Sequence, residues 1–96
     1  MKYPVHVAIQ IVPLSKQDPY ALIDKAIEVI QHSGVEFRVG AMETVMQGDY
    51  DQLMRVARNA QQACLDAGAD EVVVTMKVHA HRHKPVNWED KLAKYN

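Results

Sequence analysis

Two kinds of hydrophobic pattern alternate along the chain and predict six secondary-structure elements. Four segments have the character of strands, and they are residues 5–12, 35–39, 42–47 and 71–79. Apolar residues recur at a spacing of three and four between Asp18 and Gly34, and again between Asp49 and Gly68. This spacing predicts two amphipathic helices. The order along the chain is therefore strand–helix–strand, repeated once.

The residues at the ends of these segments support the same division. Pro13 has no backbone N–H to donate to a ladder, so we expect it to end the first strand. Asp18 and Pro19 suit the N-cap and the first position of a helix. Asp49 stands three residues before Gln52, which is the spacing of a capping box. Each helix is thus predicted to begin at an aspartate.

Two strand–helix–strand units in one short chain predict an α+β fold, the ferredoxin-like βαββαβ sandwich. That fold has a four-stranded antiparallel sheet with two helices on one face. We expect one such domain over residues 1–84 and a C-terminal tail over residues 85–96. Asn87 is placed to cap a short helix in the tail, with Trp88 on its apolar side. A helix this short needs a surface to dock on.

The face of the sheet without helices is the second feature that the pattern predicts. It is expected to carry side chains drawn from His6, Gln10, Glu36, Arg38, Thr75 and Lys77. The uninterrupted valine run at residues 72–74 is typical of a strand that is covered on both faces. We therefore expect another subunit to cover this face.

Composition and charge exclude several classes of protein. The chain has 96 residues, with 11 Lys and Arg against 12 Asp and Glu, so its net charge of −1 argues against a sequence-independent nucleic-acid binder. No apolar run approaches the roughly 20 residues of a membrane span. The single cysteine, Cys64, fits a reducing compartment, and we expect a cytoplasmic protein.

The sequence offers little for catalysis or for a metal. Cys64 lies on the predicted buried stripe of the second helix, which favours an inert core residue. The alternating histidines, His79, His81 and His83, are weak candidates for metal ligands. Arg82 and neighbouring Lys84 oppose a cation there, so a solvated strand end is the competing interpretation and we expect no metal and no cofactor.

Polar residues within the predicted strands are better candidates for a binding site. Gln10 lies in the middle of the first strand, where its amide offers both a donor and an acceptor. Glu43 and Thr44 lie in the third strand, and glutamate is disfavoured in strands unless something uses it. A hydrogen bond across a subunit interface is the alternative role for Gln10. Asp49 is expected to be occupied as a helix cap.

An ordered set of segments resembles the thiamine-binding protein family, a small cytoplasmic group that was once classed only as a domain of unknown function. The set comprises residues 7–14, Ser33-Gly34, residues 39–44, Gly48-Asp49 and residues 68–78. The resemblance implies the ferredoxin-like fold and assembly through the sheets into a homodimer or homotetramer. It also implies binding of thiamine or its hydroxymethylpyrimidine part without chemistry.

Carried onto this sequence, the resemblance implies ligand-binding roles for five residues, Gln10, Ser33, Glu43, Thr44 and Gly48. Apolar walls for a flat ring are expected from Ile9, Phe37, Met42 and Met46. The histidine run and the tail are expected to lie beyond the compact family domain. Two alternatives remain open, which are an assembly module without a ligand and an enzyme in which His6 or His32 titrates.

Overall fold

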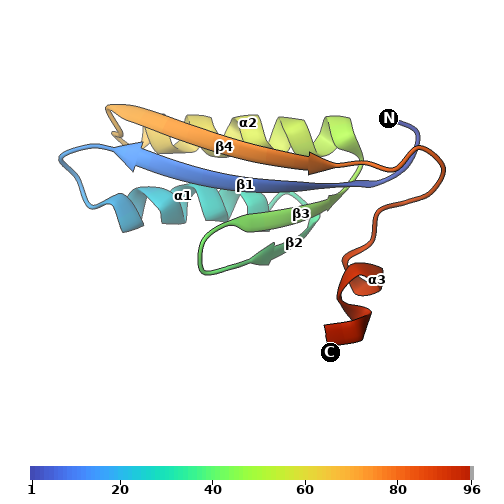
Figure 1. Ribbon diagram of the computed structural model, residues 1–96. Coiled ribbons are helices and arrows are strands. Elements are labelled where there is room, and N and C mark those ends of the chain that lie inside the picture. The colour runs from blue at the N-terminus through green and yellow to red at the C-terminus, as the bar shows by residue number, and fades with distance from the viewer. Residues whose placement is uncertain (96) are drawn as a thin grey trace.

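The computed structural model describes residues 1–95 and has two layers, a sheet and a pair of helices on one of its faces (Figure 1). The elements follow in the order β1 (Val5–Leu14), α1 (Pro19–Gln31), β2 (Glu36–Val39), β3 (Thr44–Gly48), α2 (Tyr50–Asp66), β4 (Glu71–His79), α3 (Trp88–Leu92) and the 3₁₀ turn η1 (Ala93–Tyr95). The strand order is β2-β3-β1-β4, with every pair antiparallel. The predicted ferredoxin-like fold and its short C-terminal helix are confirmed.

The helices begin where their caps predict. The Asp18 carboxylate accepts a hydrogen bond from the Tyr20 amide at 3.0 Å, and Pro19 is the first residue of α1. The Asp49 carboxylate accepts one from the Gln52 amide at 3.0 Å. These contacts satisfy backbone donors that have no partner within the helix.

The core lies between the sheet and the two helices. Val5, Val7 and Ile9 of β1 face the helices and are buried, as is Met46 of β3. From the helices come Leu22, Ala26, Ile30, Leu53, Val56, Ala57, Ala60 and Cys64. The small alanines of α2 permit close approach of that helix to the sheet, while the larger residues fill the space beside them.

Two predicted strand ends were wrong. β1 continues through Pro13 to Leu14, because its pairing with β4 extends to the Leu14–Glu71 pair. Beyond Ile9 the other side of β1 has no partner strand, and proline is tolerated at such an edge. The third strand begins at Thr44 and not at Met42, because residues 40–43 form the tip of the hairpin.

This difference in strand length leaves part of β1 open. Its pairing with β3 ends at Ile9–Thr44, whereas its pairing with β4 continues for a further five residues. Figure 1 shows the β2–β3 hairpin (green) ending beside α1 while β1 (blue) runs on past it. A notch therefore lies between the free edge of β1, the hairpin tip and α1.

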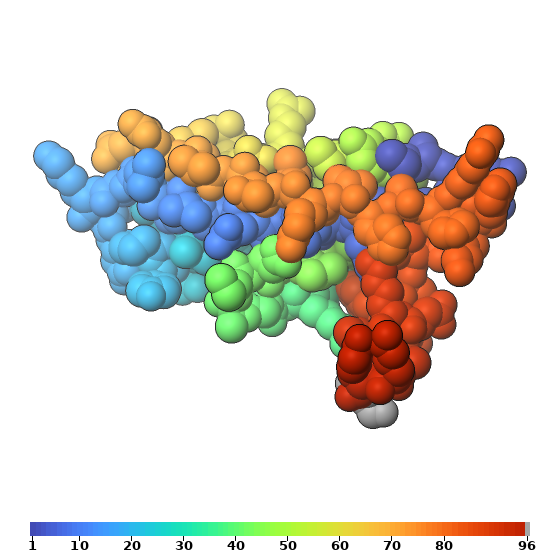
Figure 2. All heavy atoms as spheres, viewed as in Figure 1, coloured from blue at the N-terminus to red at the C-terminus, as the bar shows by residue number. Residues whose placement is uncertain are grey.

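The helix-free face follows from the register. His6, Ala8 and Gln10 of β1 lie opposite His79, Lys77 and Thr75 of β4 on this face. Val73 also lies there and is 53% exposed, whereas Val72 and Val74 pack against the core, so the described chain covers the valine run on one face only. Figure 2 shows β4 (orange) running uncovered along the near side of the molecule. No helix among residues 1–95 is long and apolar enough to cross a membrane.

Candidate functional site

The notch beside β1 contains a cavity of about 270 Å³, close to the lower end of the volumes that hold small organic ligands. Three elements line it. β1 contributes residues 9–11, α1 contributes one side of its first three turns, and the hairpin contributes residues 39–44. In Figure 2 the hairpin tip (green) and α1 (light blue) lie on either side of this position.

Three of the five predicted ligand-binding residues line this cavity, namely Gln10, Glu43 and Thr44. Gln10 and Glu43 belong to the helix-free side of the sheet, whereas Thr44 pairs with Ile9 on the side of the helices. They can share one cavity because β3 starts only at Thr44, so the notch connects the two sides of the sheet at this point.

Thr44 and Gln10 have free hydrogen-bonding groups. Thr44 is 7% exposed, and its hydroxyl makes no hydrogen bond to any other residue within 1–95. The Gln10 amide likewise has no side-chain partner within that range. Among residues 1–95 every fully buried side-chain nitrogen or oxygen has a hydrogen-bond partner, so the Thr44 hydroxyl is not sealed in the core and remains accessible from the cavity, where a ligand can bond to it.

The apolar wall of the cavity comes mainly from α1. The fully buried residues of α1 are Leu22, Ala26 and Ile30, and Val29 packs against the core beside them. Ile23 and Ile27 are half-buried and line the cavity with Tyr20, which is 76% exposed. The excess of apolar residues on α1 is thus explained by the cavity.

Of the four residues expected to form apolar walls, two lie in the cavity and two do not. Ile9 and Met42 line it. Met46 is fully buried in the core, and Phe37 packs against that core from β2. The reason is register, because Met46 lies opposite Val7 and Phe37 lies opposite Met46, further along the sheet than the notch.

A tight hairpin and an ion pair hold Glu43 in place. The Gly40 amide donates to the Glu43 carbonyl oxygen at 2.9 Å, and a Cβ at Gly40 would lie 2.8 Å from that oxygen. Only glycine fits this approach. The Lys77 Nζ of β4 donates to the Glu43 Oε1 at 2.9 Å across the helix-free face.

The other two predicted residues, Ser33 and Gly48, do not line this cavity. The Ser33 hydroxyl donates to the Ile30 carbonyl at 2.6 Å and accepts from the Val35 amide, so it closes the end of α1. Gly48 is the last residue of β3 and has a φ of +155°, which allows the chain to turn into α2. Gly48 therefore lies at the opposite end of β3 from Thr44.

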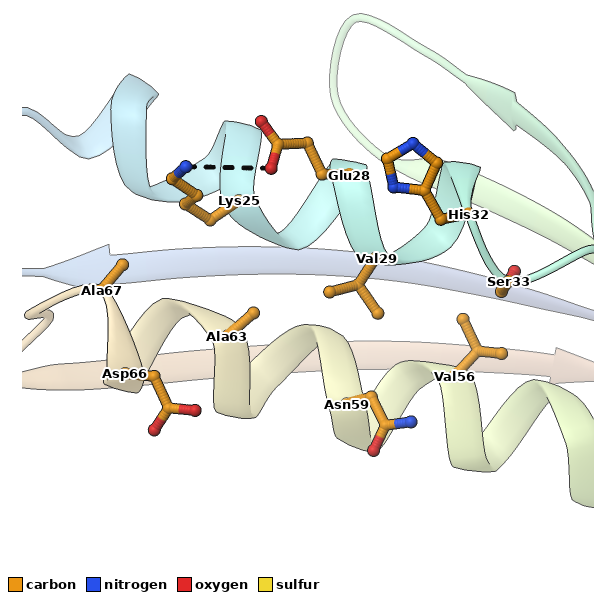
Figure 3. A pocket seen from close by; sticks show the side chains of 10 residues that line it. All are labelled: Lys25, Glu28, Val29, His32, Ser33, Val56, Asn59, Ala63, Asp66 and Ala67. Atoms are coloured by element: carbon orange, nitrogen blue, oxygen red, sulfur yellow. Dashed lines mark ion pairs between the residues drawn. The ribbon is translucent and has the colours of Figure 1, made fainter.

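A second, more open hollow of about 700 Å³ lies between α1 and α2 on the outside of the helix layer, and Ser33 borders it. Figure 3 shows that Val29, Val56 and Ala63 point into the space between the helices, whereas Asn59 and Asp66 point away from α1. Lys25 and Glu28 form an exposed ion pair at 3.8 Å on its rim. Polar groups do not converge here, so the notch is the better candidate for a ligand site.

A cluster around His6 was not predicted from the sequence. The Lys91 Nζ donates to the His6 Nδ1 at 2.8 Å, so the His6 Nε2 carries the proton and donates to the Gln47 Oε1 at 2.6 Å. Trp88 stacks on the His6 ring with centroids 5.7 Å apart. The Arg38 guanidinium lies over the Trp88 ring, 4.7 Å from its centroid. These contacts fasten the tail to the helix-free face.

Burial lowers the pKa of His6 below its ordinary value, and the nearby charges of Lys91 and His79 lower it further, against the hydrogen bond to Gln47, which raises it. Burial also lowers the pKa of Lys91. His6 is thus neutral at pH 7 and packed under an indole. Only the alternating polar position of His6 in a strand hinted at such a role.

The remaining candidates have structural surroundings. Burial raises the pKa of Cys64, and its Sγ donates to the Leu22 carbonyl at 3.2 Å inside the core. β4 ends at His79, so His81 and His83 lie in the loop that follows it. Among residues 1–95 no group of three or more histidine, cysteine, aspartate or glutamate side chains is arranged to hold a metal ion.

Comparison with known proteins gives consistent matches. Residues 7–96 match the model of the family described as thiamine-binding protein. A UPF0045 protein of Clostridium perfringens is 37% identical over 92 residues, which cover 94% of this chain and 95% of the relative. The match includes the tail, so the expectation that the tail lies beyond the family domain was wrong.

Solved structures agree with this match. A domain of unknown function from Bacillus cereus has a TM-score of 0.95 and 45% identity, over 98% of this chain and 91% of its own. A Methanocaldococcus jannaschii protein has a TM-score of 0.86 and 29% identity, over 96% and 95%. A Thermotoga maritima protein described as a candidate for thiamine biosynthesis or salvage has a TM-score of 0.87 and 24% identity, over 97% and 99%, and shares the fold.

Proposed function

Because the chain belongs to the thiamine-binding protein family, we propose that it binds thiamine, or the hydroxymethylpyrimidine part of thiamine, without transforming it. The observation that carries this proposal is the convergence of Gln10, Glu43 and Thr44 on one cavity with an isoleucine wall. Small-molecule sites generally combine apolar walls with a few placed polar groups.

The polar groups of the cavity suit an aminopyrimidine. The edge of that ring alternates donors and acceptors, and the Gln10 amide supplies one of each. The Thr44 hydroxyl, which has no partner among the described residues, supplies a further hydrogen bond. Ile23 and Ile27 offer apolar surface to the flat face of the ring.

The charge of the cavity suits the other half of thiamine. A thiazolium ring is a permanent cation, and Glu43 contributes a carboxylate among the residues that line the site. Opposite charges at short range attract even in partly exposed sites, although solvent weakens the attraction. Asp24 of α1 also lines the cavity and adds to its negative character.

Binding without chemistry fits the surroundings of the candidate nucleophiles and bases in the described chain, because these groups are buried or already hydrogen-bonded. The only thiol, at Cys64, is 0% exposed, and the Ser33 hydroxyl is hydrogen-bonded to backbone. His6, the first candidate for a titrating enzyme group, is packed between Gln47, Lys91 and Trp88. A free cysteine suits the reducing cytoplasm, where we place this function.

The proposal includes assembly into a homodimer or homotetramer through the sheets. β4 pairs on one side only and exposes nine residues of strand edge. On the helix-free face Val12, Leu14 and Val73 are each more than 40% exposed. Edge strands and apolar patches of this kind are typical contact surfaces.

Isothermal titration calorimetry of the wild-type chain with thiamine, and separately with hydroxymethylpyrimidine, tests the proposal. We expect saturable binding with one ligand per subunit. Glu43→Gln is expected to weaken the binding of thiamine more than the binding of hydroxymethylpyrimidine, because only thiamine carries the cation. An absence of heat with both ligands, on a chain whose circular dichroism shows it folded, would refute the ligand proposal.

A second function is favoured by the exposed valine face. In that case the chain is an oligomeric structural or regulatory module, and Gln10 bonds across a subunit interface. Light scattering and calorimetry together distinguish the two functions. A stable oligomer that binds neither ligand, and that dissociates on Gln10→Ala, would support the module.

A further inference from the structure

A pair of opposite charges lies at one side of the cavity, because Glu43 of the hairpin tip lines the cavity and Lys77 of β4 is ion-paired with Glu43. The Lys77 Nζ lies 2.9 Å from the Glu43 Oε1. Lys77 pairs with Ala8 in the register of β1 and β4, and Ala8 pairs with Val45 on the other side. The methyl group of Ala8 leaves room for the lysine side chain to cross β1 and reach the hairpin tip.

The two partners differ in how firmly they are held. The Lys77 side chain is 70% exposed and the Glu43 side chain is 35% exposed. Glu43 is also fixed by its backbone, since its carbonyl accepts from the Gly40 amide. Lys77 is therefore the partner that can turn away into solvent, while the Glu43 carboxylate remains at the cavity.

This pairing changes which ligand charge the site favours. A ligand that is only a cation must displace the Lys77 ammonium from Glu43 and then lie beside it, which is unfavourable. A neutral ring breaks no ion pair. A ligand that carries a cation and an anion close together can exchange partners, so that Glu43 meets the cation and Lys77 meets the anion.

We propose that the Lys77–Glu43 pair makes the cavity selective for a zwitterionic ligand, a heteroaromatic cation with an anionic group on a short arm, of which a thiamine phosphate ester is the representative. The inference rests on the proposed function and names the ligand class for the same site. Lys77 is then a specificity-determining residue that contacts the anionic group.

The expected size of the effect is modest because the pair is partly exposed. Exposed charge pairs change equilibria by at most about fivefold, and salt screens them. We expect about threefold preference of the wild type for thiamine monophosphate over thiamine at low ionic strength. The preference should shrink as salt is added.

The experiment is calorimetry at low salt with three probes, which are hydroxymethylpyrimidine, thiamine and thiamine monophosphate. The variant is Lys77→Met, which keeps the length of the side chain. The control is Lys84→Met, which makes the same change of net charge at a residue of the β4–α3 loop, where it lines a separate hollow with His79. A thermal melt of each variant confirms that it is folded.

Lys77→Met should tighten the binding of thiamine about threefold, weaken the binding of thiamine monophosphate about threefold and leave the binding of hydroxymethylpyrimidine unchanged. The order of affinity of the two cationic ligands then reverses. Lys84→Met should bind like the wild type. The inference is overturned if Lys77→Met leaves the ratio of the monophosphate to thiamine unchanged. If hydroxymethylpyrimidine and both thiamine ligands fail to bind the wild type, the proposed function itself has failed.

Discussion

Replacing Thr44 by valine separates a ligand-binding role of this residue from a structural one. The two side chains have nearly the same shape, so the change removes the hydroxyl and leaves the packing. Thr44 is 7% exposed and its hydroxyl bonds to no other residue within 1–95. If the hydroxyl serves the ligand, its loss should affect binding and not the fold of the free protein.

The magnitude follows from the energetics of hydrogen bonds. The Thr44 hydroxyl makes no hydrogen bond within residues 1–95 and is not among the fully buried polar atoms, so Thr44→Val should leave the free energy of unfolding unchanged or raise it by up to about 1 kcal/mol. For a domain of this size that corresponds to a rise in Tm of about 4–8 °C. Loss of one hydrogen bond to the ligand should cost about 1 kcal/mol, which is about fivefold in Kd.

The assay is a thermal melt of the free protein and calorimetry with hydroxymethylpyrimidine. Thr75→Val is the matched control. It also replaces a threonine by valine, but at an exposed position of β4 that does not line the cavity. We expect the control to bind normally. A Thr44→Val variant that melts several degrees lower and binds with unchanged Kd would refute the reasoning, since the hydroxyl would then be structural.

Three further predictions concern the tail and the assembly. Because the pKa of His6 is lowered in the folded state, the unfolded chain binds more protons than the folded chain below about pH 6.5. The contribution of His6 to folding stability should therefore be full above that pH and fall as the pH drops toward the lowered pKa. The midpoint of urea unfolding measures this pH dependence, and His6→Gln should flatten it. Trp88→Ala should remove the stacking on His6 and make the chain after Val86 more susceptible to limited proteolysis than in the wild type, and equal rates of cleavage for the two chains would contradict the docking. Val73→Asp should give a folded chain of smaller mass by light scattering, because Val73 is 53% exposed within one chain, while Val73→Thr should keep the mass; an unchanged mass for the aspartate variant would place the interface elsewhere.

The residues that depend on local patterns were predicted well. Asp18 and Asp49 cap their helices, and the six elements of the main fold follow the alternating and helical spacings, because capping and periodicity involve residues only a few positions apart. Gln10, Glu43 and Thr44 were selected because each is a polar residue within a predicted strand, although Glu43 lies in the hairpin tip of the structure. That signal identifies a residue with some role, but it does not say which residues meet.

Tertiary structure decided which residues meet. The cavity exists because β3 begins at Thr44 while β1 continues to Leu14, and the length of a strand depends on its partners in space. For the same reason Pro13 did not end β1, and Ile23 and Ile27 line the cavity while their neighbours fill the core.

The sequence by itself therefore determined the order of the elements, the positions of the caps and a set of polar residues within or next to strands. The tertiary structure alone decided that Lys77 reaches Glu43 across 34 positions of sequence and that Lys91 reaches His6 across 85. The physical reason is that hydrogen bonds and ion pairs act over a few ångströms. Only the folded register brings such distant residues within that range.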